Sequence, residues 1–132
     1  MSDSQRPKIL LVDDEPDMLD FLERSLRKRF QVVRAPNGLD ALSMLAADQF
    51  EVLITDQKMP KMGGLELLER ISDEYPKLIR LLLSGFAEIP EIRRAKNTCR
   101  IHNYIFKPVD SRKLLAAIDQ AYANFAADAS PE

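Results

Sequence analysis

The sequence predicts an α/β fold built around a parallel sheet, and three observations support this prediction. Five short apolar runs alternate with five amphipathic stretches along the 132 residues. The runs are nearly continuous, which is typical of strands that are buried on both faces of a parallel sheet. Alternation of strands and helices favours right-handed crossovers between parallel strands. A chain of this length has room for one domain with a single core.

The apolar runs give the predicted strands in chain order. They cover residues 9–12, 30–33, 52–54, 81–83 and 104–106. The second run is the weakest, and it ends near the turn-forming residues Pro36, Asn37 and Gly38. Each of the other four is followed by polar side chains, which are, in order, Asp13 with Asp14, Asp56, Ser84 and Lys107.

The stretches between the runs are predicted helices, because their apolar residues recur at spacings of three and four. The recurring residues are Met18, Leu22 and Leu26; Leu39, Leu42 and Leu45; Leu65, Leu68 and Ile71; Ile89, Ile92 and Ala95; and Leu114, Ile118, Ala121 and Phe125. Pro16 suits the first turn of a helix, where its missing N–H costs nothing. Asp110 and Ser111 indicate the start of the last helix.

Composition narrows the class of protein. Hydrophobic residues make up 45% of the chain and charged residues 30%, and the net charge is −2. This balance gives no reason to expect direct nucleic-acid binding or membrane binding by the domain. The opening MSDSQRPK has no hydrophobic signal region, and the single Cys99 fits a reducing compartment. We therefore expect a cytoplasmic protein.

We expect one domain over residues 8–126. Residues 1–7 are predicted to be a flexible N-terminus. Residues 127–132 are predicted to be a flexible tail or the start of a linker. The sequence shows no internal repeat beyond the strand–helix alternation.

The polar residues that follow the strands are predicted to meet at one place. In a parallel sheet all strands point the same way, so these residues lie at the carboxyl edge of the sheet. Open α/β sheets bind ligands at that edge, near the point where the strand order reverses. Asp13, Asp14, Asp56, Ser84 and Lys107 would therefore share one crevice.

These side chains predict a site for phosphoryl transfer. Three crowded carboxylates repel one another, and a divalent cation removes that penalty. An all-oxygen ligand set suits Mg²⁺ or Mn²⁺, and the sequence has no histidine or cysteine cluster for zinc. A lysine would hold an incoming anion and a serine hydroxyl would donate to it. An aspartate can itself be the nucleophile and become an acyl phosphate.

Four motifs in this order resemble the receiver domain of two-component response regulators: ILLVDDEPDML, ITDQKMPKMGGLELL, LLLSGF and YIFKPVD. The resemblance covers about residues 8–125. It implies a doubly wound, flavodoxin-like or CheY-like fold, in which five helices flank a five-stranded parallel sheet of order 2-1-3-4-5. It also implies a phosphorylation switch and not a turnover enzyme. Such a switch catalyses at most its own phosphorylation and dephosphorylation.

The resemblance implies a role for each matching residue. Asp56 matches the phosphoacceptor, and Asp13 and Asp14 match the acidic pair that holds Mg²⁺, with Asp14 and Asp56 as ligands. The backbone carbonyl of Lys58 matches the main-chain ligand of the metal. Ser84 matches the switch hydroxyl that moves toward the phosphoryl group.

Three further residues complete the match. Lys107 matches the lysine that contacts the phosphoryl group, and the Lys107–Pro108 peptide bond matches a cis bond. Tyr104 matches the switch aromatic, whose turn reshapes the surface of the fourth helix, fifth strand and fifth helix. The implied partners are a histidine kinase or phosphotransfer protein and an output domain or effector. The resemblance leaves open whether the chain forms a homodimer when it is phosphorylated.

The sequence departs from the family pattern in two places near the fifth strand. Thr98-Cys99-Arg100 stands where a helix-capping glycine is usual, and His102-Asn103 replaces an acidic pair. Two alternative functions stay open as well. One is a Mg²⁺-dependent phosphohydrolase with an aspartyl nucleophile, although Asp13-Asp14-Glu15 lacks the D-x-D that it needs. The other is a receiver-shaped binding module that is not phosphorylated.

Overall fold

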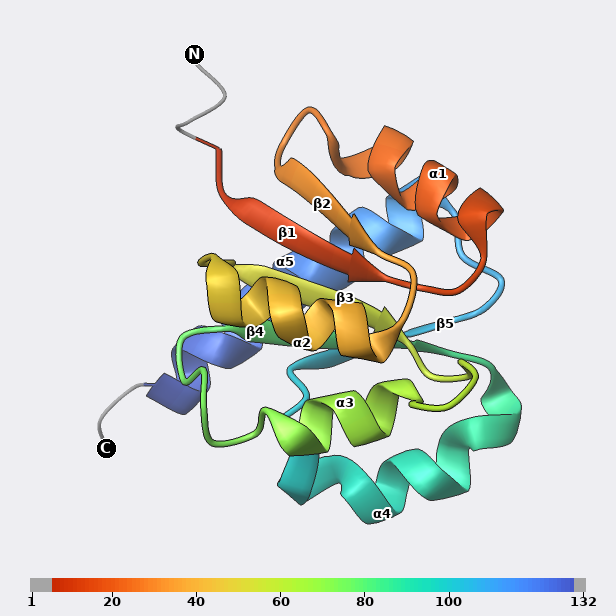
Figure 1. Cartoon of the computed structure of the whole chain (residues 1–132), viewed down its shortest axis with the longest axis vertical. Helices are drawn as coiled ribbons and strands as arrows, with labels where there is room; N and C mark the ends of the chain where they lie inside the picture. Colours follow the sequence, from red (N-terminus) through yellow and green to blue (C-terminus); the bar gives the residue numbers. More distant parts are fainter. Residues whose placement is uncertain (1–5, 130–132) are drawn as a thin grey trace.

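A computed structural model describes residues 6–129 of the chain as one sheet with helices on both faces (Figure 1). The five strands are parallel and lie in the order β2-β1-β3-β4-β5. Their bounds are β1 Lys8–Val12, β2 Gln31–Ala35, β3 Val52–Asp56, β4 Ile79–Ser84 and β5 Asn103–Phe106. The predicted fold class and strand order are therefore confirmed.

Five α-helices connect and follow the strands: α1 Pro16–Leu26, α2 Gly38–Ala47, α3 Gly64–Arg70, α4 Ile89–Cys99 and α5 Ser111–Ala129. A short 3₁₀ helix, η2 Phe86–Glu88, precedes α4. Helices α1 and α5 cover one face of the sheet, and α2, α3 and α4 cover the other. No helix within residues 6–129 is both long and apolar enough to cross a lipid bilayer.

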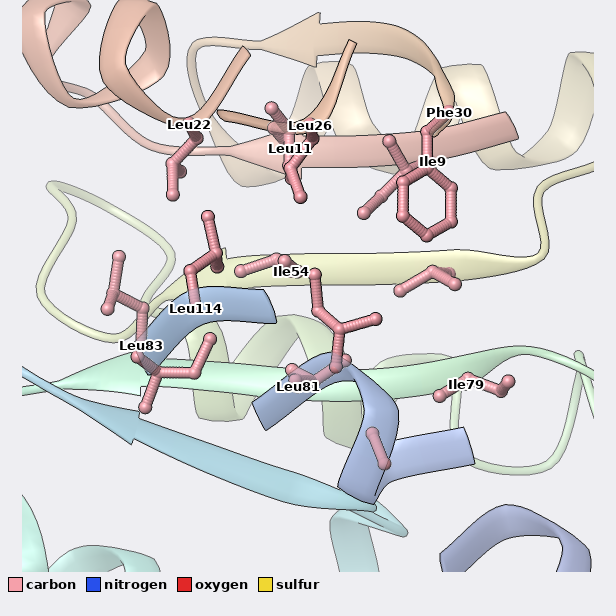
Figure 2. Close-up of a cluster of buried hydrophobic side chains, with 14 of the residues drawn as sticks. Ile9, Leu11, Leu22, Leu26, Phe30, Ile54, Ile79, Leu81, Leu83 and Leu114 are labelled. Carbon is pink, nitrogen blue, oxygen red and sulfur yellow. The ribbon is translucent and has the colours of Figure 1, made fainter. Parts of the chain in front are cut away.

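The sheet divides the apolar core into two layers, because successive side chains of a strand point to opposite faces. Ile9 and Leu11 of β1 pack with α1 and α5, whereas Leu10 and Val12 pack with the other three helices. Figure 2 shows the first layer, in which Phe30 closes the end beside Ile9. The four β1 residues are at most 1% exposed, as expected for a central strand of a doubly wound sheet.

The ends of the domain differ from the predicted limits. Helix α5 continues to Ala129, beyond residue 126, and residues 126, 127 and 129 are alanines with high helix propensity. The carbonyl of Pro7 accepts a hydrogen bond from the N–H of Gln31 at 2.8 Å, so the chain already follows β2 before β1 begins. Residues 1–5 and 130–132 of the predicted ends lie outside the described residues.

Local signals set the helix boundaries. Pro16 opens α1, and Asn37 caps α2 by accepting a hydrogen bond from Asp40 N–H. Asp110 caps α5 in the same way, through the N–H of Lys113 at 2.7 Å. Helix α4 ends at Cys99, and its C-cap residue, Arg100, adopts the left-handed conformation with φ 53° and ψ 47°. Arg100 thus occupies the backbone conformation for which a glycine is usual.

Candidate functional site

Three carboxylates gather at the carboxyl edge of the sheet, where the register aligns the ends of β1 and β3. Asp13 and Asp14 directly follow β1, and Asp56 is the last residue of β3. One carboxylate oxygen from each lies within 4.8 Å of the others. Asp13 is fully buried and Asp56 is 2% exposed, whereas Asp14 faces solvent. The structure therefore brings together the three acidic residues that the sequence placed at this edge.

Asp13 has unmet hydrogen-bonding capacity. Its Oδ1 accepts the N–H of Glu15 at 3.0 Å, but its buried Oδ2 has no hydrogen-bond partner within residues 6–129. The pKa of Asp13 is raised to about 7, mainly because burial outweighs the Glu15 hydrogen bond, and the charge of Asp56 contributes to the rise. An unpartnered carboxylate oxygen beside two other carboxylates is the environment in which a hard cation is most stabilising.

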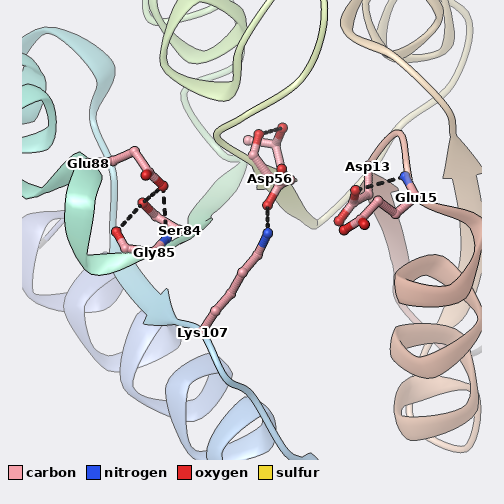
Figure 3. Close-up of polar contacts among 8 residues, drawn as sticks. Asp13, Glu15, Asp56, Ser84, Gly85, Glu88 and Lys107 are labelled. Carbon is pink, nitrogen blue, oxygen red and sulfur yellow. Dashed lines mark hydrogen bonds and ion pairs between the residues drawn. The ribbon is translucent and has the colours of Figure 1, made fainter.

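Lys107 faces Asp56 across the pocket (Figure 3). Its Nζ lies 2.7 Å from Asp56 Oδ1, and its side chain is 32% exposed. Burial raises the pKa of Asp56, and the Lys107 ammonium limits that rise. Burial alone would lower the pKa of Lys107, but its hydrogen bond and attraction to Asp56 raise it. Each of the two groups therefore favours the charged form of the other.

The backbone around Lys107 positions this ammonium. The Lys107 N–H donates to the carbonyl of Ser84 at 2.9 Å, which continues the ladder between β4 and β5 by one bond. The Lys107–Pro108 peptide bond is cis. The side chain thus leaves the sheet at the end of β5 and reaches toward the end of β3.

Ser84 reaches the same edge, but its hydroxyl does not contact Asp56. The residue ends β4 and is 1% exposed. Its Oγ donates to Glu88 Oε1 at 2.9 Å, with the carbonyl of Gly85 as a second acceptor at 3.0 Å. Lys58 lies in the exposed loop two residues after Asp56. Asp13, Asp14, Asp56 and Lys107 are thus assembled, whereas the Ser84 hydroxyl is held aside.

Tyr104 lies in β5, and its position is half-buried. Its ring stacks on that of Phe106, with centroids 6.4 Å apart and planes 18° apart. Its hydroxyl is buried without a hydrogen-bond partner in the described part of the chain, and burial raises its pKa. A buried phenol with no partner is held by packing alone, so no polar contact opposes a change of rotamer.

Gly64, the first residue of α3, packs directly against the backbone at the end of β3. A Cβ atom at Gly64 would lie 2.4 Å from the carbonyl oxygen of Asp56 and 2.9 Å from Leu82 Cδ1. The Gly64 N–H also donates to the carbonyl of Gln57 at 3.0 Å. The start of α3 can therefore approach β3 this closely only because residue 64 has no side chain.

Sequence reasoning missed two residues of the site, Glu15 and Glu88. Glu15 contributes its backbone N–H to Asp13, which no side-chain pattern reveals. Glu88 contributes a carboxylate that is 8% exposed, four residues after Ser84. An acidic residue just before a helical pattern normally indicates a helix cap, and that signal does not distinguish a cap from this contact.

Comparison with known proteins places this geometry in a family. The family model for the response regulator receiver domain matches residues 9–119. A solved structure, the signal receiver domain of an HD domain-containing protein from Pseudomonas fluorescens, is 34% identical with a TM-score of 0.84. The match covers 93% of this chain and 99% of the chain in that structure.

Two curated relatives differ in length. The hydrogenase transcriptional regulatory protein HoxA of Cupriavidus necator is 32% identical over 121 residues, which are 92% of this chain and 25% of HoxA. An uncharacterized 14.6 kDa protein of Leptolyngbya boryana is 37% identical over 92% of this chain and 94% of its own length. The chain therefore spans about a quarter of the first relative and nearly all of the other.

Proposed function

Since the chain belongs to the response regulator receiver family and is a receiver domain of the two-component kind, we propose that Asp56 is its phosphoacceptor. The single observation that carries this proposal is the assembly around Asp56. Two further carboxylates lie within 4.8 Å on one side, and the Lys107 ammonium lies 2.7 Å away on the other. A buried carboxylate with a cation opposite an acidic pair suits nucleophilic attack on phosphorus.

The transfer step conserves atoms and charge. A carboxylate oxygen of Asp56 forms a bond to the phosphorus of a phosphohistidine, and the phosphorus–nitrogen bond breaks. The electron pair of that bond stays on the imidazole nitrogen, which takes up a proton from water. Lys107 stays charged and donates a hydrogen bond to a phosphoryl oxygen, so that it positions and stabilises the anion.

Asp13, Asp14 and Asp56 would hold a Mg²⁺ or Mn²⁺ ion, together with the backbone carbonyl of Lys58. The unpartnered Oδ2 of Asp13 and the all-oxygen donor set support this assignment. The ion, when bound, supplies positive charge to the phosphoryl oxygens. Burial is the main cause that raises the pKa of Asp13, and the neighbouring charges of Asp56 and Asp14 add smaller contributions that a bound cation would offset.

The donor is proposed to be a histidine kinase or a histidine phosphotransfer protein. A hollow of about 430 Å³ lies between the start of α1 and the loop after β5, beside Lys107. Met18, Phe21 and Val109 line it with apolar surface. A helix that carries a phosphohistidine could seat its apolar side there and present the phosphoryl group to Asp56.

The phosphoryl group is proposed to bias a two-state switch. The group carries about 1.5 to 2 negative charges and three acceptor oxygens, which replace the single charge of the Asp56 carboxylate next to Ser84 and Lys107. Ser84 then turns toward it, Tyr104 changes rotamer, and the surface of α4, β5 and α5 is remodelled for an output domain, an effector or a second copy of this chain. HoxA is a regulator about four times as long as the matched segment, which supports attachment to an output.

Intact-mass spectrometry tests the proposal. The protein is incubated with Mg²⁺ and acetyl phosphate, a small phosphodonor. The parent should gain the mass of one phosphoryl group, and Asp56→Asn should gain none. Asp128→Asn, an exposed position near the end of α5, is the matched control and should behave as the parent. Equal phosphorylation of Asp56→Asn would reject Asp56 as the acceptor.

The same measurement separates the two alternatives. Steady release of phosphate from phosphate esters would favour a phosphohydrolase. Absence of both phosphorylation and Mg²⁺ binding at millimolar concentration would favour a binding module that is not phosphorylated. Family membership favours neither of them.

A further inference from the structure

Glu88 holds the hydroxyl of Ser84 away from Asp56. Its Oε1 accepts two hydrogen bonds, from Ser84 Oγ and from the Gly85 N–H, each at 2.9 Å (Figure 3). Glu88 ends η2, and only 8% of the residue is exposed. The side chain therefore closes a small ring with the last residue of β4 and the residue after it.

This contact is not a helix cap. Glu88 is the N-cap residue of α4, but its side chain makes no capping hydrogen bond. Its carboxylate turns back to the end of β4 instead, as Figure 3 shows. The carboxylate therefore makes its hydrogen bonds with Ser84 and with Gly85, the residue before η2, and not with the N–H groups of α4.

A hydroxyl has one hydrogen, so Ser84 donates to one acceptor fully at any time. While it donates to Glu88, it is unavailable to a group on Asp56. The two hydrogen bonds, first that of Gly85 and then that of Ser84, hold the pKa of Glu88 below its ordinary value against the effect of burial. Glu88 is therefore an anion at neutral pH, and charged acceptors make the stronger hydrogen bonds.

We propose that Glu88 is a positioning residue that competes with the phosphoryl group for the Ser84 hydroxyl and so sets the equilibrium constant of the switch. This inference rests on the proposed role of Asp56 as acceptor. The Gly85 carbonyl, 3.0 Å from the hydroxyl, remains as a second acceptor when the Glu88 carboxylate is removed. Removing Glu88 destabilises the unphosphorylated arrangement of Ser84 more than the phosphorylated one, and the balance shifts toward the second.

The test uses beryllofluoride, a tetrahedral mimic of a phosphoryl group, bound to the whole chain with Mg²⁺ and followed by ¹⁹F NMR. Glu88→Ala should bind it about tenfold more tightly than the parent, which corresponds to about 1.4 kcal/mol. Glu88→Gln keeps an uncharged acceptor and should show a smaller gain. Glu91→Gln removes an exposed carboxylate from the same helix and should leave the affinity unchanged.

A double-mutant cycle with Ser84→Ala separates hydroxyl competition from simple charge repulsion. In the Ser84→Ala background, Glu88→Ala should no longer increase the affinity. If the gain persists there in full, or if Gln and Ala give equal gains, charge alone is responsible and the proposal is wrong. If Glu88→Ala and Glu88→Gln bind no more tightly than Glu91→Gln, the proposal is also wrong.

A failure of the proposed function gives a different result. If the parent binds no beryllofluoride, or if Asp56→Asn binds it equally well, then Asp56 is not the acceptor. Thermal unfolding of each variant shows that it is folded, and Glu88→Gln keeps the inference testable if Glu88→Ala does not fold.

Discussion

Lys107 Nζ lies 2.7 Å from Asp56 Oδ1, so the last residue of β3 and the residue that follows β5 form an ion pair, although the two strands are not neighbours in the sheet. Strand β4 lies between β3 and β5, and the lysine reaches past its end. Asp56 is only 2% exposed, so this ammonium is the main compensation for its buried charge. The geometry of the pair therefore depends on the backbone ladder that fixes the end of β5.

Lys107→Met should lower the rate of phosphorylation by acetyl phosphate about a hundredfold. The substitution keeps the length of the side chain but removes the charge that stabilises the anion in the transition state, an effect of about 10²–10³ in rate for one such donor. Intact mass against time measures the rate. Lys77→Met, at an exposed position after α3, is the control and should react as the parent does. An unchanged rate for Lys107→Met would show that the ion pair is only structural.

Asp13→Asn should stabilise the metal-free protein at pH 8. The pKa of Asp13 is about 7 in the folded protein and about 3.8 when unfolded, so the folded state binds more protons between these values. In the parent without metal, the free energy of unfolding therefore falls as the pH rises from about 4 to about 7, by roughly 2–4 kcal/mol.

Urea unfolding at pH 5 and pH 8 with EDTA checks this, and Asp17→Asn, an exposed position, is the control. The Asp13→Asn curve should depend less on pH than that of the parent. Mg²⁺ should raise the stability of the parent at pH 8 and have little effect on Asp13→Asn. A variant that is less stable than the parent at pH 8 would contradict the assignment.

Arg100→Gly should raise the free energy of unfolding by about 1 kcal/mol. Arg100 is the C-cap residue of α4 and has φ 53°, a conformation that strains any residue with a Cβ. The variant also loses an exposed ion pair with Asp73 at 3.0 Å, which contributes little. Arg100→Ala loses the same ion pair but keeps the strain, and it should be no more stable than the parent in urea. Equal stability of the Gly and Ala variants would show that the backbone is not strained there.

His102 should make the protein less stable in mild acid. Its half-buried ring accepts the N–H of Arg80 at Nδ1 at 2.9 Å, and burial lowers its pKa below the ordinary value of 6.5. Asp128 opposes this shift and Arg80 adds to it. The unfolded state therefore binds a proton before the folded state does. The contribution of His102 to stability is present above pH 6.5 and is lost as the pH falls through the folded pKa.

His102→Asn tests this directly, because its amide oxygen can replace Nδ1 as an acceptor but does not titrate. Thermal unfolding between pH 7.5 and pH 5 should show a smaller loss of stability in the variant than in the parent. Parallel curves for the two proteins would mean that this ring does not contribute to the acid sensitivity.

The layout of strands and helices could be predicted because apolar spacing alone decides it, but the strand ends could not. Strand β4 begins at Ile79 and takes in Arg80, although Arg80 is charged, because its backbone pairs with β3. That guanidinium is 1% exposed, and two of its nitrogens have no partner among the described residues. The weak second run became the edge strand β2, which is half-buried and therefore less apolar.

The acidic cluster and Lys107 could be predicted because parallel strands place their carboxyl ends together. The hydrogen bond of the Ser84 hydroxyl could not be predicted, because it depends on the direction in which the Glu88 side chain points. The Glu88 side chain makes no capping hydrogen bond to α4, and nothing in its spacing from Ser84 distinguishes that orientation from the one observed. The apolar periodicity of the sequence thus predicts which residues meet at the site, whereas the hydrogen bonds among them depend on side-chain rotamers.

The close approach of Gly64 to the Asp56 carbonyl fixes the position of the end of β3 relative to α3. The strand that carries the acceptor cannot shift toward α3, because there is no free space into which its backbone could move. If Asp56 is phosphorylated as proposed, the strand end that carries it therefore keeps its place against α3, and the rearrangement falls to side chains such as Ser84 and Tyr104.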